Sequence, residues 1–291
     1  MGTKILWILA CVPLYVVNAF CDKFVSVKNQ KGYNTLYNCI KFFICSACMV
    51  PVFLLTGGGR FAFGGLVCGV LCGIFYAVSK TVMLKGYEAT SVAFMTLCHS
   101  SGMIVPCIVG HFLWSEKLSL ISLCGIVLTI LSILLLKGRG ESRKTIGSSG
   151  IVFGLIIFLT SGGVMITQKA MGFYFREEGI TLYTFYSFLV PALILLIFSG
   201  RGEKKKLSEG DGKRIGICAL GSAVSLSVIS FVMTSLASGV PSVILFPLFN
   251  GLGIIAVCIS SVFVFKEKLN LSKSIGLILG VLGLYMINSA L

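Results

Sequence analysis

The amino-acid sequence predicts an all-α integral membrane protein, with ten transmembrane helices arranged as two inverted five-helix repeats. Three observations lead to this prediction. The 291 residues are 56% hydrophobic and only 12% charged, whereas a soluble domain is about 25% charged. Ten apolar segments come close to the roughly 20 residues that a helix needs to cross a bilayer. Two parts of the chain also repeat each other at a nearly constant spacing.

Composition and charge exclude several classes of protein. The mean hydropathy is +1.00, and so much apolar surface requires the bilayer as its solvent. The net charge of +14 does not indicate a nucleic-acid partner, because the Lys and Arg residues lie mainly in short loops without a basic aromatic face. The twelve Cys are scattered through apolar segments, so we expect no disulfide framework, and no metal or redox site at Cys45 and Cys48.

The apolar segments are predicted to be helices, because the strands of a membrane barrel would alternate between apolar and polar residues. We interpret the first segment as a retained span rather than a signal peptide, since apolar segments continue to the end of the chain. The predicted spans are residues 5–21, 33–56, 61–84, 89–114, 119–136, 148–171, 180–199, 214–237, 240–265 and 273–290.

The internal repeat is the most informative feature of the sequence. WSEKL at 114–118 recurs 151 positions later as FKEKL at 265–269. TLY at 35–37 recurs 146 positions later at 181–183, and Lys23 meets Lys169 at the same spacing. We therefore expect the chain to divide near residue 146.

The predicted halves are residues 1–146 and 147–291, with five spans each. Because five is an odd number, the second half has to enter the membrane from the opposite side. Inverted halves of this kind form alternating-access carriers, which bind their solute near the midplane of the membrane, between the repeats.

The same residues carry a family resemblance. LKGYEATS at 84–91, followed by an apolar run through Pro106 to WSEKL at 114–118, resembles the repeat of the drug/metabolite transporter superfamily. The ten-helix EamA-type permeases, with duplicated five-helix units, are the most similar branch. Residues 240–291 are similar to the last two helices of small multidrug resistance proteins. The resemblance implies a fold and a transport role, and it names no substrate.

Polar residues at membrane depth are the candidate binding residues, because such groups usually face a cavity or a partner. His99 lies well inside its predicted span, and the 151-residue shift places it on Asn250. We expect the two side chains to face each other across the central axis and to bind substrate, although each could simply hydrogen-bond a neighbouring helix. A His also suits proton coupling, because its charge changes near physiological pH.

A polar helical face gives a second set of candidates. Tyr76, Ser79 and Met83 share one face of the third span, and we expect it to line the substrate path. Hydroxyl contacts between helices are the alternative interpretation. The 151-residue shift carries this face onto Ser227, Ser230 and Thr234.

Further candidates come from other spans. Asn18 lies on a polar face of the first span that ends at Asp22, which we place too close to the helix end to act as the buried acidic residue of small multidrug carriers. Lys41 and Lys80 fall inside spans, where we favour ammonium groups that snorkel to the interface, with attraction of an anionic group by Lys80 as the alternative. Tyr183, with Tyr76 and Phe246, is a candidate for an aromatic cage around a quaternary ammonium.

Enzymatic signatures are missing from the sequence. His99 and His111 are its two His residues, and no carboxylate is placed beside them for a metal site. No Gly-rich phosphate loop is present, so we expect neither an enzyme nor a cofactor nor an ATP-driven pump. Glu116 and Glu267 recur in the repeat, but both stand beside Lys at helix ends, where we expect structural ion pairs in loops.

The distribution of Lys and Arg predicts an orientation. Loops after the odd-numbered spans, together with the first residues of the spans that follow them, hold 17 of the 24 basic residues. The positive-inside rule therefore places the loops 137–144 and 201–214 in the cytoplasm and both termini outside. We expect a multi-pass protein of the plasma membrane.

The function that we predict is secondary transport of a small metabolite, an amino acid or a related amphipathic solute, by alternating access, with proton coupling as a further hypothesis. Its partners are then the small-molecule substrate and the lipid bilayer. Three alternatives stay open on the same scaffold: a multidrug or quaternary-ammonium carrier, a lipid-carrier flippase and a cation channel.

Overall fold

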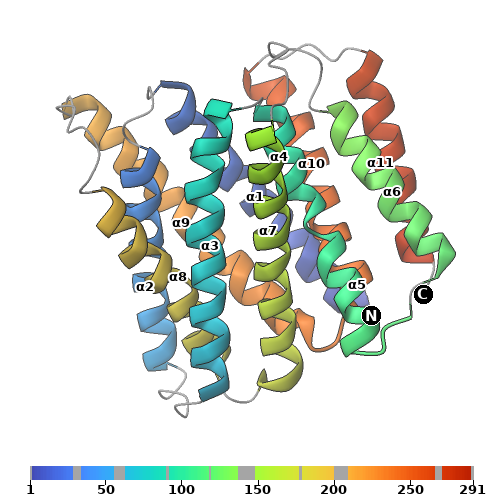
Figure 1. Ribbon diagram of the computed structural model, residues 1–291, viewed down its shortest axis with the longest axis horizontal. Coiled ribbons are helices and arrows are strands. Elements are labelled where there is room, and N and C mark those ends of the chain that lie inside the picture. Colours follow the sequence, from blue (N-terminus) through green and yellow to red (C-terminus); the bar gives the residue numbers. More distant parts are fainter. Residues whose placement is uncertain are drawn as a thin grey trace.

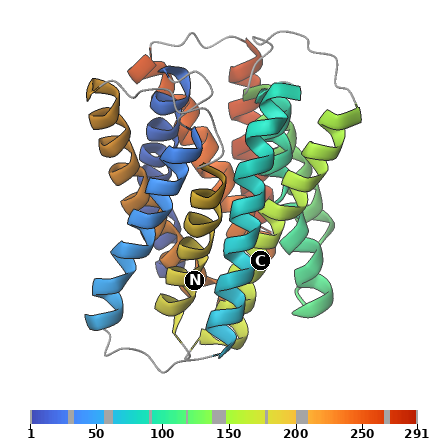
Figure 2. The ribbon, with the colours of Figure 1, turned by 60° about the vertical axis from the view of Figure 1, so that its left-hand side comes forward.

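The computed structural model describes residues 2–28, 34–55, 63–89, 92–117, 119–136, 148–176, 179–199, 209–265 and 271–289. These residues form eleven helices and no strand, and the helices run side by side as one bundle (Figures 1 and 2). The helices are α1 (Gly2–Lys28), α2 (Asn34–Leu55), α3 (Phe63–Ala89), α4 (Val92–Ser101), α5 (Ile104–Leu113), α6 (Leu120–Leu136), α7 (Ser148–Tyr174), α8 (Ile180–Ser199), α9 (Glu209–Ala237), α10 (Ser242–Phe265) and α11 (Leu271–Ser289).

The helices are those of a multi-pass membrane protein. Seven are long and apolar enough to cross a bilayer, and three further apolar stretches are shorter: Leu97–Leu113, Leu120–Leu135 and Ser274–Ile287. Many large apolar side chains point outward from the bundle, including Leu55, Phe112 and Leu271, as lipid-facing side chains do. The prediction of an all-helical membrane protein is confirmed, whereas the count of ten spans stays a prediction.

One predicted span, residues 89–114, consists of two helices, because the chain turns at Gly102 and Met103 between α4 and α5. Pro106 lacks the N–H that would bond the Gly102 carbonyl, and this carbonyl accepts from Val105 instead, at 3.1 Å. The His99 carbonyl accepts a hydrogen bond of 2.9 Å from the Ser161 hydroxyl of α7. Irregular backbone of this kind occurs in membrane proteins where it lines a cavity or is covered by protein.

The two halves interlock rather than lie apart. Helix α6 packs along α11, and α2 packs along α8; Figure 1 shows α6 and α11 side by side at one edge. Helix α3 contacts α7 and α8, while α9 contacts α1 and α2. Helix α1 contacts α10, as α7 contacts α4 and α5. Exchanging α1–α6 for α7–α11 leaves this set of contacts unchanged, which is the pattern that two related halves produce.

Small residues allow these helices to approach closely, as expected for membrane helices. A side-chain carbon added at Gly125 of α6 would lie 2.7 Å from the backbone oxygen of Gly283 in α11. Gly69 of α3 lies equally close to α8, since a carbon added there would lie 2.8 Å from the Tyr183 backbone oxygen.

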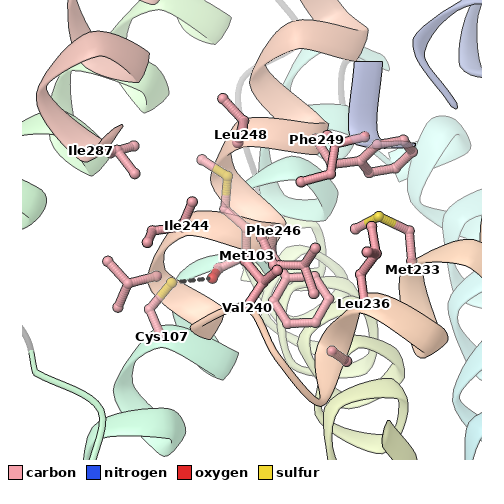
Figure 3. Close-up of a cluster of buried hydrophobic side chains, with 14 of the residues drawn as sticks. Met103, Cys107, Met233, Leu236, Val240, Ile244, Phe246, Leu248, Phe249 and Ile287 are labelled. Atoms are coloured by element: carbon pink, nitrogen blue, oxygen red, sulfur yellow. Dashed lines mark hydrogen bonds between the residues drawn. The ribbon is translucent and has the colours of Figure 1, made fainter. Parts of the chain in front are cut away.

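The largest cluster of buried apolar side chains surrounds α10. Figure 3 shows Phe246 and Phe249 of α10 close to Met233 of α9, with Cys107 of α5 on the other side of α10. The Cys107 thiol donates to the Met103 carbonyl at 3.1 Å. This packing holds α10 in the middle of the bundle, with one face turned toward the cavity described below.

Candidate functional site

A cavity of about 270 Å³ lies inside the bundle, between helices of both halves. Residues of α1, α2, α3 and α4 of the first half and residues of α7, α9 and α10 of the second half line it together. The lining consists of Tyr15, Asn18, Ala19, Asp22, Lys41, Tyr76, Ser79, Lys80, Met83, His99, Ser161, Val164, Met165, Gln168, Leu226, Ile229, Ser230, Met233, Phe246, Phe249 and Asn250.

The lining residues follow helical periodicity. On α1 they are Tyr15, Asn18, Ala19 and Asp22, at positions i, i+3, i+4 and i+7 of one face. The rise of 1.5 Å per residue makes such a face about 10 Å long. Helices α3, α7 and α9 each contribute a face with the same spacing, so the cavity runs along about two turns of each helix.

The two halves line the cavity at matching positions. Each lining residue of α1 has a counterpart in α7 at a spacing of 146, and each one of α3 has a counterpart in α9 at a spacing of 150. His99 and Asn250 correspond at a spacing of 151. In order, the pairs are Tyr15 and Ser161, Asn18 and Val164, Ala19 and Met165, Asp22 and Gln168, Tyr76 and Leu226, Ser79 and Ile229, Lys80 and Ser230, and Met83 and Met233.

An ion pair lies in the wall of the cavity. The Lys41 ammonium lies 2.9 Å from Oδ1 and 3.2 Å from Oδ2 of Asp22. The Tyr37 hydroxyl donates to Oδ1 at 2.7 Å, and the Ser222 hydroxyl lies 3.3 Å from it. Lys41 is only 1% exposed, whereas Asp22 is 34% exposed. The aspartate is therefore both neutralised by Lys41 and accessible from the cavity.

His99 and Asn250, the pair predicted from the repeat, both line this cavity. His99 lies in the last turn of α4, beside the break that separates α4 from α5. The Asn250 amide donates to the Phe246 carbonyl at 2.9 Å. The geometry therefore brings both side chains to one space, and their role in binding stays a prediction.

The ten candidate residues predicted from the sequence divide into two groups. Seven of the ten candidates line the cavity: His99, Asn250, Tyr76, Ser79, Ser230, Asn18 and Lys80.

The remaining three are buried elsewhere. Ser227 faces the Cys45 carbonyl at 3.4 Å, and the Thr234 hydroxyl donates to the Ser230 carbonyl at 2.8 Å. Tyr183 is fully buried, with its hydroxyl 3.4 Å from Thr167. None of the three belongs to the cavity lining. Ser227 and Thr234 were predicted from a repeat shift of 151 residues, whereas the residues of α9 that line the cavity follow a shift of 150. An error of one residue rotates the predicted face of a helix by about 100°.

Two expectations about charged residues are corrected. Asp22 does not lie at a helix end, because α1 continues to Lys28. Lys41 does not snorkel to the membrane interface, since its ammonium is buried against Asp22. Lys80 lies nine residues before the end of α3 at Ala89 and lines the cavity.

A second buried ion pair joins the halves outside the cavity. One Glu116 oxygen lies 2.7 Å from the Lys169 ammonium of α7, and the other accepts the Ser242 N–H of α10 at 2.7 Å. Lys169 also donates to the Val240 carbonyl at 2.8 Å. The ion pair of Glu116 is thus formed with α7 rather than within its own loop. Glu267, its counterpart, lies outside the described residues.

The cysteines and the possible metal-ligating side chains are scattered through the described helices. All twelve Cys are free thiols. Within the described ranges, no three His, Cys, Asp or Glu side chains are grouped so that they could hold a metal ion.

Comparison with known proteins identifies the family. The model of the EamA-like transporter family matches the chain twice, at residues 3–137 and at residues 148–289. The chain belongs to the EamA-like transporter family. The resemblance to the drug/metabolite transporter superfamily is thereby confirmed, and the protein is a membrane transporter by family.

Individual relatives add less detail. An uncharacterized transporter of Bacillus subtilis (strain 168), YxxF, is 25% identical over 144 residues, which cover 48% of this chain and 44% of YxxF. The match thus spans less than half of that relative. A solved protein crystal structure superposes with a TM-score of 0.80 over 99% of this chain and 98% of its own, at 12% identity, which shows a shared fold.

Proposed function

We propose that this EamA-like protein is a secondary transporter, which moves a small metabolite across the plasma membrane by alternating access between two inverted five-helix halves, residues 1–146 and 147–291. The observation that carries the proposal is the matched lining of the cavity, in which positions of α1, α3 and α4 correspond to positions of α7, α9 and α10. A solute between two equivalent walls can be exposed to either side by rocking one wall against the other.

The size and chemistry of the cavity favour a small amphipathic solute, such as an amino acid or a related compound. About 270 Å³ accommodates a metabolite rather than a lipid-linked oligosaccharide. Apolar side chains, among them Met165, Ile229 and Phe249, provide one part of the wall, and Asn18, His99 and Asn250 provide hydrogen-bonding groups. This combination of apolar lining and few polar groups is typical of small-molecule sites.

The multidrug alternative receives less support. Of the three candidates for an aromatic cage, Tyr76 and Phe246 line the cavity, whereas Tyr183 is buried and does not belong to the lining. Lys80 also places a cation in the lining, which opposes a cationic ligand.

Orientation and coupling belong to the same proposal. The surplus of Lys and Arg after the odd-numbered spans supports a cytoplasmic position for the loops 137–144 and 201–214; residues 137–147 and 200–208 lie outside the described residues. His99 supports proton coupling, because it lines the solute cavity and can change its charge near neutral pH.

The experiment is counterflow into proteoliposomes loaded with unlabelled amino acids and small carboxylic acids, with each labelled compound added outside at two pH values. His99→Ala and Asn250→Ala are each expected to reduce the counterflow rate at least about tenfold, because loss of a buried polar contact to a solute costs roughly 1–3 kcal/mol. Both variants should reach the membrane in normal amounts. Full transport by the double variant would overturn the assignment of the site.

A further inference from the structure

The charges of the cavity lie in one half only. Asp22 corresponds to Gln168 and Lys80 corresponds to Ser230, so each of these charged side chains of the first half has an uncharged counterpart in the second. Lys41 corresponds to Ser187 at the spacing of 146, and Ser187 bonds the Thr184 carbonyl within its own helix. The two halves therefore contribute matching positions but different charges to the cavity. A charged end of a solute suits the first half, and an uncharged end suits the second.

Two of the three charges neutralise each other. The Asp22 carboxylate accepts hydrogen bonds from the Lys41 ammonium at 2.9 Å and from the Tyr37 hydroxyl at 2.7 Å. The ammonium neutralises the charge of the carboxylate. Within the described part of the chain, no carboxylate lies within 4.0 Å of the Lys80 ammonium. Asp22, Lys41 and Lys80 together therefore carry a net formal charge of one positive unit, located on Lys80.

Two serine side chains of the cavity lining have hydroxyl groups without a hydrogen-bond partner in the described part of the chain. Ser79 precedes Lys80 on α3, and Ser230 is the counterpart of Lys80 on α9. Both serines are buried, and neither hydroxyl has a hydrogen-bond partner among the residues that the structure describes. Because an unsatisfied buried hydroxyl costs free energy, these two donors suit an acceptor that occupies the cavity.

We propose that the cavity selects an amphipathic carboxylate with a net negative charge, whose head group binds the Lys80 ammonium and the Ser79 and Ser230 hydroxyls. The rest of the solute lies against the apolar side chains of the second half, such as Met165, Ile229 and Phe249. The inference deepens the proposed function and rests on it, since it names the class of solute that the same cavity takes.

The test is a ligand series that varies only in charge. Phenylacetate, phenylacetamide and phenethylamine share one shape and carry a negative, no and a positive charge, respectively. We expect phenylacetate to raise the melting temperature of the purified protein with saturating dependence on its concentration, because a ligand that binds the folded state stabilises it. Phenylacetamide and phenethylamine are expected to give a smaller shift or none.

Variants of α3 assign the effect to Lys80. Lys80→Gln is expected to weaken the apparent affinity for phenylacetate at least about tenfold, as loss of a charge-assisted hydrogen bond does. Lys80→Arg keeps the cation and should keep the binding. Lys85→Gln, at an exposed position of the same helix, is the matched control and should bind like the wild type. If Lys80→Gln does not fold, the ligand series on the wild type and on Lys80→Arg still tests the charge preference of the cavity.

The inference is overturned if phenylacetate gives no shift, if phenethylamine stabilises as much as phenylacetate, or if Lys80→Gln retains full phenylacetate affinity. Each of these results leaves the transport proposal intact, provided that a bulky side chain placed in the cavity, as in Ser230→Trp, still abolishes counterflow. Conversely, a cavity block without effect on counterflow refutes the transport proposal, whatever the charge preference of the cavity.

Discussion

Glu116→Ala is expected to lower the free energy of unfolding by about 3–5 kcal/mol, which is typical when one partner of a buried ion pair is removed. The Glu116 and Lys169 side chains are 9% and 3% exposed, and their charged atoms lie 2.7 Å apart. Without the carboxylate, the Lys169 ammonium keeps two contacts, the Val240 carbonyl and the Trp114 ring at 5.9 Å, but no counter-ion. The Ser242 N–H also loses its acceptor. Unfolding of the purified protein by SDS, titrated in mixed micelles, measures this change.

A double variant separates the loss of charge pairing from a loss of packing. In Glu116→Met/Lys169→Met no buried charge remains, so this protein is expected to be more stable than Glu116→Ala by at least about 1 kcal/mol. Lys117→Ala changes an exposed neighbour and should stay within about 0.5 kcal/mol of the wild type. If single and double variants were equally unstable, the ion pair would not be the cause.

Asp22→Asn is the second change with a large expected effect. It leaves Lys41 buried at 1% exposure without its counter-ion, and it is expected to destabilise the protein by about 3 kcal/mol, the lower end of the range for buried pairs, because Asp22 itself faces the cavity. Counterflow is expected to fall at least about tenfold, since the balance of charges around the solute changes. SDS unfolding and proteoliposome counterflow measure the two effects.

A second substitution, at Lys41, tests whether the unpaired charge causes the loss of stability. Asp22→Asn/Lys41→Met removes both charges and is expected to recover most of the lost stability, because no unpaired charge remains in the wall. Asp22→Asn protein that unfolds at the same SDS concentration as the wild type would contradict the structural role of the Asp22–Lys41 pair.

Much of the fold could be predicted from hydrophobicity and from the repeat. Apolar length predicted helical segments that the structure contains, and the recurrence of WSEKL at 114–118 as FKEKL at 265–269 related His99 to Asn250, which line one cavity. The break in the fourth span was not predicted, because Pro106 alone does not show whether a helix kinks or stops.

The sequence predicted Lys80 but not the ion pair of Asp22 and Lys41, and the reasons are physical. Hydropathy does not indicate which helices contact each other, so it could not predict the ion pair of Lys41 with Asp22. Hydropathy also ended the first span at residue 21, whereas α1 extends through a less apolar turn to Lys28. On α9, an error of one residue in the repeat shift pointed to Ser227 and Thr234 in place of Leu226 and Met233.

The measurement that tests the account most directly is counterflow by two tryptophan variants of the same helix. Ser230→Trp fills the cavity from α9, whereas Val228→Trp adds the same side chain at an exposed position on the outer surface of α9. The account predicts that Ser230→Trp reaches the membrane and loses counterflow at least about tenfold, while Val228→Trp transports like the wild type. Full counterflow by a folded Ser230→Trp protein would show that the solute does not pass through this cavity.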